Sequence, residues 1–209
     1  MTTPEDMVRF NEVMSHVRKL IEDRDDRVAG IIAGAFIEEL LEQLLRSFMV
    51  EKTPDELWSF NGPLGTFANK AAIAYSLGLL EDEAFVNIRA IRDIRNKCAH
   101  LIGLDSGFVV DLTKSPLSDH LKETIPGRWR ERLPRDQVAV FDQLRHDISA
   151  PEKARDYFEL IVSITAMMIV ATRTSLPSRC VVPPDRHVGA GAGWAMEGQG
   201  RKRRKGKLK

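Results

Sequence analysis

Arg95, Asn96 and His100 are the residues of this chain whose types and spacing best suit chemistry. They occur in the segment Arg95-Asn96-Lys97-Cys98-Ala99-His100. An arginine keeps its positive charge and stabilises an anion, and a histidine exchanges a proton near neutral pH. Asn96 and His100 are four residues apart, so on a helix both face the same ligand or neighbour. We therefore take Arg95, Asn96 and His100 as candidate catalytic residues.

The segment around these residues is predicted to form one helix with an apolar side and a polar side. At about 100° per residue, its apolar side chains share one arc: Ile88, Ile91, Ile94, Cys98, Leu101 and Ile102. A second arc holds Arg89, Arg92, Asn96 and His100, and we expect Arg89 and Arg92 to bind a partner. Arg95 lies at the edge of the apolar arc. Because a buried guanidinium keeps its charge, Arg95 needs a carboxylate, backbone carbonyls or a partner chain.

Two uses of Arg95 and His100 remain open. In a metal-independent ribonuclease, His100 would exchange a proton with the 2′-hydroxyl or the leaving oxygen, Arg95 would stabilise the anionic transition state, and Asn96 would orient the histidine or the phosphate. The chain has no second histidine nearby, so a symmetric dimer would bring two such sets together. In a structural use, Arg95 pairs with an acid of the preceding helix and His100 caps the helix C-terminus. The acids in reach are Glu38, Glu39 and Glu42.

The composition is that of a globular protein with one sizeable core, 209 residues long and 43% hydrophobic. Cys98 and Cys180 form no Cys-x-x-Cys pair, which indicates a reducing compartment. The first residues lack the pattern of a signal peptide. The longest uncharged run, residues 160–172, is shorter than the ~20 residues needed to cross a bilayer and is predicted to be a fully buried helix. We expect a cytoplasmic location and no membrane partner. We expect no metal site and no cofactor, because the other histidines are scattered: His16, His120, His146 and His187.

Helical periodicity and capping residues predict an all-α protein with no convincing strand series. The expected helices cover residues 4–21, 27–49, 67–80, 82–101, 137–146 and 151–173, with a short element after residue 53. Gly30, Ala33 and Gly34 allow another helix to approach closely. Residues 103–134 are polar and irregular, an insertion with room for one strand pair or a short helix. We predict a single-domain helical bundle over residues 1–176 and a linker rich in proline and glycine over 177–200.

The last nine residues are strongly basic and are predicted to form a disordered tail. Residues 201–209 hold 7 of the 31 basic residues and no acid, so the other 200 residues hold 24 basic and 30 acidic residues, a balance of −6. The tail attracts phosphate without reading sequence, or is a solvated end that folds back on the acidic body. Its candidate binding residues are Arg201, Lys202, Arg203, Arg204 and Lys205.

Three motifs follow one another between residues 57 and 101. They are the turn Leu57-Trp58-Ser59-Phe60-Asn61-Gly62-Pro63-Leu64-Gly65-Thr66-Phe67, the helix end Ala74-Tyr75-Ser76-Leu77-Gly78-Leu79-Leu80, and the helix Ile91-Arg92-Asp93-Ile94-Arg95-Asn96-Lys97-Cys98-Ala99-His100. In this order they resemble the mannitol operon repressor family. The resemblance implies an all-helical transcriptional regulator, and no helix here has the pattern of a DNA-reading helix.

The third motif also resembles the Arg-Asn-x-x-x-His signature of HEPN domains, helical proteins of which many are metal-independent ribonucleases that act as dimers. The leading interpretation is a non-catalytic, repressor-like regulator. It is expected to form a homodimer and to act through protein or nucleic-acid contacts. One alternative is a HEPN-like endoribonuclease that uses Arg95, Asn96 and His100. A further alternative is an antitoxin-like helical scaffold in which these residues are only structural.

Overall fold

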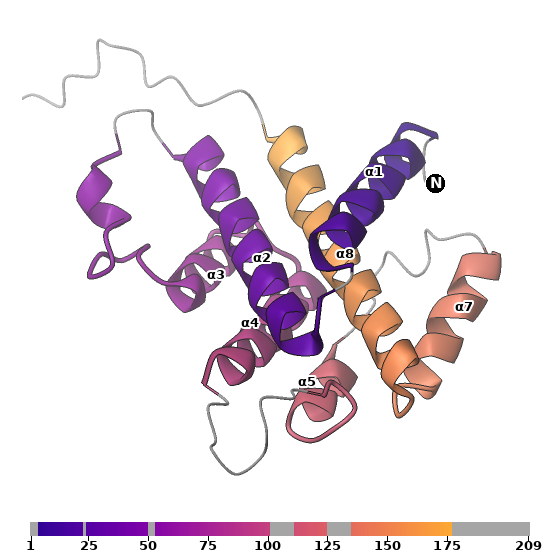
Figure 1. The fold of residues 1–209 in the computed structure, drawn as a ribbon. Coiled ribbons are helices and arrows are strands. Elements are labelled where there is room, and N and C mark those ends of the chain that lie inside the picture. Colours follow the sequence, from indigo (N-terminus) through magenta and orange to yellow (C-terminus); the bar gives the residue numbers. More distant parts are fainter. Residues whose placement is uncertain (1–3, 23, 50–52, 101–110, 125–134, 177–209) are drawn as a thin grey trace, which may run out of the picture.

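The protein is all-α, as its periodicity predicts. The structure is a computed structural model that describes residues 4–22, 24–49, 53–100, 111–124 and 135–176, and within these ranges it contains helices and turns but no strand. Figure 1 shows the arrangement. The elements in chain order are α1 (Pro4–Ile21), α2 (Asp26–Phe48), the 3-10 turn η1 (Asp55–Leu57), α3 (Phe67–Ser76), α4 (Asp82–His100), α5 (Leu117–Glu123), α7 (Arg135–His146) and α8 (Pro151–Ser175).

Helices α2 and α8 form the centre of the body. Helix α2 packs against α1, α3, α4 and α8, and α8 also packs against α1, α4 and α7. In Figure 1, α1 lies on one side of this central pair, and α3 and α4 lie on the other. The apolar arcs of the helices meet between them. The largest fully buried side chains are Ile21, Ile37, Leu41, Leu44, Leu45, Leu64, Ile88, Ile91, Ile94, Tyr157 and Phe158.

Small residues of α2 let α4 approach closely, as expected. A Cβ atom added to Gly30 would lie 2.6 Å from the Sγ atom of Cys98. One added to Gly34 would lie 2.5 Å from the Cγ atom of Arg95. Real Cβ atoms avoid such short contacts, because they lie well inside the van der Waals distance. The two glycines therefore set the distance between α2 and α4, and Gly34 receives the aliphatic part of Arg95.

Helix α3 ends at Ser76, earlier than the predicted end at residue 80. Gly78 adopts a left-handed conformation with φ of 71°. The amide of Gly78 donates to the carbonyl of Tyr75 at 2.9 Å, and the amide of Leu79 donates to the carbonyl of Ala74 at 3.0 Å. This is the Schellman arrangement, in which glycine stops a helix and satisfies its last carbonyls. The apolar residues Leu79 and Leu80 continue the hydrophobic pattern outside the helix, which is why periodicity alone placed the end too late.

The other predicted boundaries agree with the structure within about two residues, a normal margin for helix ends. The irregular insertion contains the short helix α5 and no strand pair within residues 111–124. Leu101 and Ile102, the linker over 177–200 and the basic tail over 201–209 lie outside the described residues.

Helix α8 contains the long uncharged run of residues 160–172. Residues 161–169 are buried as predicted, whereas residues 160 and 170–172 are only half-buried. By length and composition α8 could cross a membrane, but 56% of its most apolar window is buried inside the body. A core helix of a soluble protein passes the same test, so the feature carries little weight for a membrane location.

Candidate functional site

Helix α4 presents an apolar side to the core and a cationic side to solvent. Ile88, Ile91, Ile94 and Cys98 are fully buried, which confirms these four members of the predicted apolar arc. Asn87 is also fully buried, and the sequence pattern gave no reason to single it out. Because these side chains fix the rotation of α4, the orientation of its polar face follows from them.

Arg95 lies at the edge of the apolar arc and is half-buried, as its position on the helix suggested. Its Nη1 atom donates a hydrogen bond to the Oδ1 atom of Asn96 at 3.1 Å. The structure does not join Arg95 to Glu38 or Glu42, which pair instead with Lys70 at 3.2 and 2.9 Å. Arg95 therefore keeps its charge without a carboxylate partner among the described residues, with its stem on Gly34 and its head against an amide.

His100 is the last residue of α4, and it is exposed. A histidine there suits the partial negative charge of a helix C-terminus. It is five residues after Arg95, so the two side chains leave the helix about 140° apart around its axis and about 7.5 Å apart along it. The hydrogen bond turns the Arg95 guanidinium toward Asn96, which shares a face with His100. The structure thus joins Arg95 to Asn96, whereas no hydrogen bond or ion pair among the described residues joins His100 to either of them.

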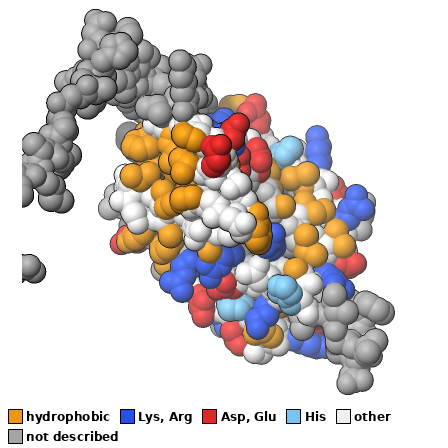
Figure 2. Space-filling model, turned by 90° about the vertical axis from the view of Figure 1, so that its left-hand side faces the viewer, with side chains coloured by type: hydrophobic (Ala, Val, Ile, Leu, Met, Phe, Trp, Pro, Cys, Tyr) orange, Lys and Arg blue, Asp and Glu red, His pale blue; other side chains and the backbone are white. Residues whose placement is uncertain are grey.

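The outer face of α4 holds further cations. Arg89 and Lys97 are exposed and have no carboxylate partner in the part of the chain that the structure describes. Arg92 is half-buried, and its Nη2 atom lies 2.6 Å from the Oδ1 atom of its neighbour Asp93. Figure 2 shows Lys, Arg and His side chains gathered on the lower half of the molecule, the level at which α4 ends in Figure 1. We call Arg89, Lys97 and His100, which lie within about 80° of one another around the helix axis, the cationic face of α4.

The C-terminal end of α4 is tied to the start of α2. The Nε atom of Arg27 donates to the carbonyl oxygen of Cys98 at 2.9 Å. Burial, followed by the negative charge of Asp26, raises the pKa of the Cys98 thiol to about 11. A thiol with so high a pKa stays protonated at neutral pH and is a poor nucleophile. Cys98 is therefore a packing residue at this site, and the chemistry of the face rests on its nitrogen groups.

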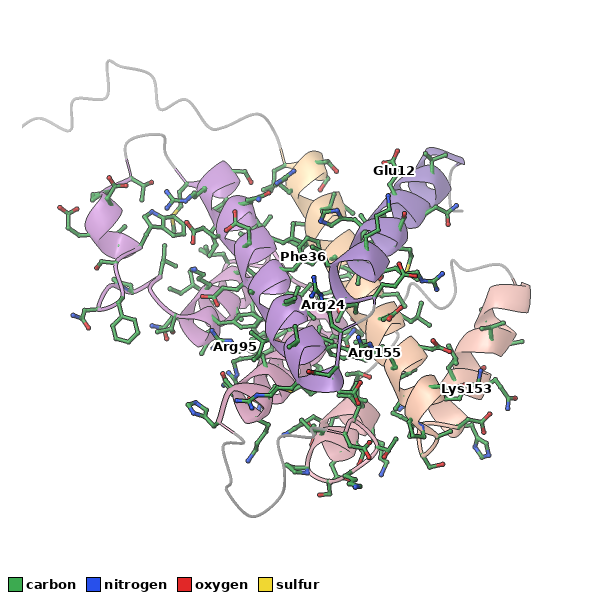
Figure 3. All side chains as sticks on the ribbon, in the orientation of Figure 1. Glu12, Arg24, Phe36, Arg95, Lys153 and Arg155 are labelled. Atoms are coloured by element: carbon green, nitrogen blue, oxygen red, sulfur yellow. The ribbon has the colours of Figure 1, made fainter. Side chains whose placement is uncertain are left out.

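Arg155 joins the same corner to α8, a role that sequence reasoning missed. Its guanidinium donates to the Asp26 carboxylate at 2.7 Å and to the carbonyl oxygens of Ile21 and Arg24 at 2.6 and 3.1 Å. The second carboxylate oxygen of Asp26 accepts the amide of Leu112 at 3.0 Å. Figure 3 shows Arg24 and Arg155 where α1, α2 and α8 meet. No signal in the sequence indicated this role, because Arg155 stands among other charged residues in the first turns of α8 and these partners are 129 to 134 residues away in the chain.

Lys70 forms a second charge cluster that sequence reasoning missed. It is 7% exposed and lies between Glu38 and Glu42, and Glu42 also pairs with Arg46 at 2.7 Å. The guanidinium of Arg46 lies 4.0 Å from the centre of the Trp58 ring, a cation–π contact. We call Lys70, Glu38, Glu42, Arg46 and Trp58 the Lys70 cluster. It joins α2, α3 and the turn of the first motif.

The pKa values of the Lys70 cluster show which effect dominates. Burial favours neutral Lys70, but the carboxylates of Glu42 and Glu38 outweigh it and raise the pKa of the lysine. Burial likewise favours protonated Glu42, but Lys70 and Arg46 outweigh it and lower the pKa of this carboxyl. Both groups are therefore charged at neutral pH and stabilise one another.

The turn of the first motif requires glycine at two positions, because a side chain at either one would overlap backbone atoms of the same turn. A Cβ atom on Gly62 would lie 2.3 Å from the carbonyl oxygen of Glu56, and one on Gly65 would lie 2.0 Å from that of Ser59. The turn presents Phe60, which is 82% exposed. It also leads into Thr66, whose hydroxyl caps α3 by accepting the amide of Asn69 at 3.2 Å.

No protein-family model, curated protein or solved structure matches the chain. The resemblances stated above therefore rest on the motifs themselves. The structure places the three motifs in the turn before α3, at the end of α3 and in α4. Helices α3 and α4 pack against each other and against α2. They form one continuous side of the body, to which the cationic face of α4 belongs.

Proposed function

We propose that the protein is a non-catalytic, repressor-like helical regulator that binds an anionic partner with the cationic face of α4. The observation that carries the proposal is that Arg89 and Lys97 are exposed without an acidic partner among the described residues. In the Lys70 cluster, by contrast, acids lie within 3.2 Å of the lysine. Cations left unpaired on a helix whose other side is fixed by the core are suited to phosphate or carboxylate groups of a partner.

The direction of α4 limits how an anion can bind there. The C-terminus of a helix carries partial negative charge, which repels phosphate. The contacts must therefore come from side chains, and Arg89, about three turns before the end, is the least affected. This geometry favours a long anionic surface, such as a nucleic-acid backbone, over one small ion at the helix end. The basic tail would add attraction of the same kind without placing the partner.

Measuring DNA binding across salt concentrations separates the face from the tail. We expect a chain of residues 1–200 to retain binding to a labelled duplex, and the double variant Arg89→Glu, Lys97→Glu to bind about tenfold more weakly, with the slope of log K against log salt reduced by about 2. The control is Lys153→Glu on α8, a charge reversal at an exposed site that Figure 3 shows on the other side of the body from Arg95 of α4. Binding that disappears with the tail and ignores the α4 variants would refute the proposal.

The Arg95–Asn96 hydrogen bond favours one second candidate, a metal-independent endoribonuclease. It holds a guanidinium beside the face that carries the exposed imidazole of His100. Incubating the protein with labelled RNA in EDTA tests this use. An enzyme would cleave RNA, and both Arg95→Ala and His100→Ala would abolish cleavage while Lys97→Ala preserved it. Absence of cleavage by the folded wild-type protein under every condition tried would remove the endoribonuclease.

A further inference from the structure

Helix α1 carries a narrow exposed stripe on the side opposite the core. Val17 and Ile21 of α1 are buried. At about 100° per residue, the opposite side holds Val8, Glu12, Ser15 and Lys19, all of which are exposed. Their spacing of four, three and four residues places all four side chains on one side of the helix. This side of α1 is a shallow, open surface formed by Val8, Asn11, Glu12, Ser15, His16 and Lys19. We call Val8, Glu12, Ser15 and Lys19 the α1 seam.

The α1 seam is complementary to itself. Glu12 and Lys19 are seven residues apart, two turns along the same side of α1. A two-fold axis crossing the helix near Ser15 makes two copies of α1 antiparallel. It then brings Glu12 of one copy to the level of Lys19 of the other, and the reverse. Serine at the crossing point is small enough for the helices to approach. Within the described residues, neither Glu12 nor Lys19 has an ion-pair partner of its own.

We infer that the α1 seam is the surface through which two copies of this chain associate, in antiparallel fashion, with Glu12 and Lys19 paired twice across the two-fold axis. A second, antiparallel copy of α1 presents a lysine opposite Glu12 and a glutamate opposite Lys19. Charge complementarity therefore selects a second copy as the occupant. An 18-residue helix is about 27 Å long. One helix pair of this length falls short of the about 800 Å² per partner of a standard interface, so the dimer depends on protein concentration and on salt.

This dimer keeps the two cationic faces apart. Figure 3 shows Glu12 on α1 and Arg95 on α4 at opposite sides of the body. Association through α1 therefore leaves both α4 faces turned outward and does not bring two His100 side chains together. A long anionic partner could contact both faces at once, and the second contact would then be intramolecular. Association of two copies is measured without any other partner and does not depend on the proposed function.

Sedimentation of the full chain over a range of concentrations at low salt tests the pairing. Lys19→Glu places two like charges at each contact, and we expect dimerisation to weaken about tenfold. The double variant Glu12→Lys, Lys19→Glu exchanges the charges and should restore the wild-type association. Lys153→Glu on α8 is the matched control, because Lys153 is also exposed and, among the described residues, pairs with Asp156 alone at 3.9 Å. A monomer at all concentrations, or a dimer that none of these variants affects, overturns the inference.

Oxidative cross-linking locates the axis. In a Cys180→Ser background, Ser15→Cys should form a disulfide-linked dimer, since a residue near a two-fold axis meets its own copy. The remaining cysteine, Cys98, is fully buried. Val140→Cys on α7 is the control, because Val140 is 58% exposed and lies off the seam. Equal cross-linking of both variants, or none by Ser15→Cys, contradicts the proposed axis even if the protein dimerises.

Discussion

The Lys70 cluster and the cationic face of α4 hold similar side chains in opposite states. Lys70 is 7% exposed and lies within 3.2 Å of two carboxylates, whereas Arg89 and Lys97 are exposed with no acid beside them among the described residues. Charges of the first kind are coupled to folding, because removing one partner leaves the others buried without compensation. Charges of the second kind contribute little to folding and remain free for a partner. The difference separates residues that hold the fold from residues suited to function.

Lys70→Met should have the largest effect on stability. The substitution keeps most of the aliphatic stem but leaves Glu38 and Glu42 facing each other, partly buried and without their shared cation. We expect a loss of about 2–4 kcal/mol in the free energy of unfolding, measured by urea denaturation. A variant as stable as the wild type would show that the cluster is solvated, and the contrast with α4 would fail.

Gly34→Ala comes next, because it pushes α2 away from the stem of Arg95. The added Cβ atom would lie 2.5 Å from the Cγ atom of Arg95, and we expect a cost of about 1–3 kcal/mol. The double variant Gly34→Ala, Arg95→Ala removes the obstructing side chain and should recover at least half of that loss. Gly78→Ala is the informative control. It meets no atom within 4 Å but has φ of 71°, so its cost comes from the backbone alone and Arg95→Ala should not rescue it.

Acid should reduce the contribution of the Lys70 cluster to the free energy of unfolding. This effect should be smaller than those of Lys70→Met and Gly34→Ala. The folded state lowers the pKa of Glu42, so its contribution to stability is present above the ordinary value of 4.5 and is lost as the pH falls through the lower, folded value. The stability gap between wild type and Lys70→Met should therefore narrow below about pH 4.5. Denaturation curves of both proteins between neutral and acidic pH measure this gap. A gap that stayed constant from neutral to acidic pH would mean that the charge of Glu42 does not contribute to the stability that Lys70→Met loses.

Sequence reasoning found the elements of this molecule and the orientation of α4, because both follow from periodicity that is local in the chain. The buried arc of Ile88, Ile91 and Ile94 was read correctly in this way. The sequence did not indicate the Lys70 cluster, because Lys70 stands in an apolar helix. The carboxylates that pair with Lys70 belong to α2, 28 and 32 residues away in the chain, and local periodicity does not show which helices pack together. For the same reason, the sequence allowed acids of α2 to be partners of Arg95. In the structure, Glu38 and Glu42 pair with Lys70, and Arg95 donates to Asn96.

Lys97→Ala should have the smallest effect on folding and is the most direct check of the comparison. An exposed cation without a carboxylate partner among the described residues loses little when it is truncated, and alanine favours a helix slightly. We expect a change within about 0.5 kcal/mol of the wild-type free energy of unfolding. Arg92→Ala is the matched control on the same helix, because it breaks the contact with Asp93 at 2.6 Å. If Lys97→Ala destabilised the protein as much as Lys70→Met, the cationic face would be holding the fold, and its exposure would no longer argue for a partner.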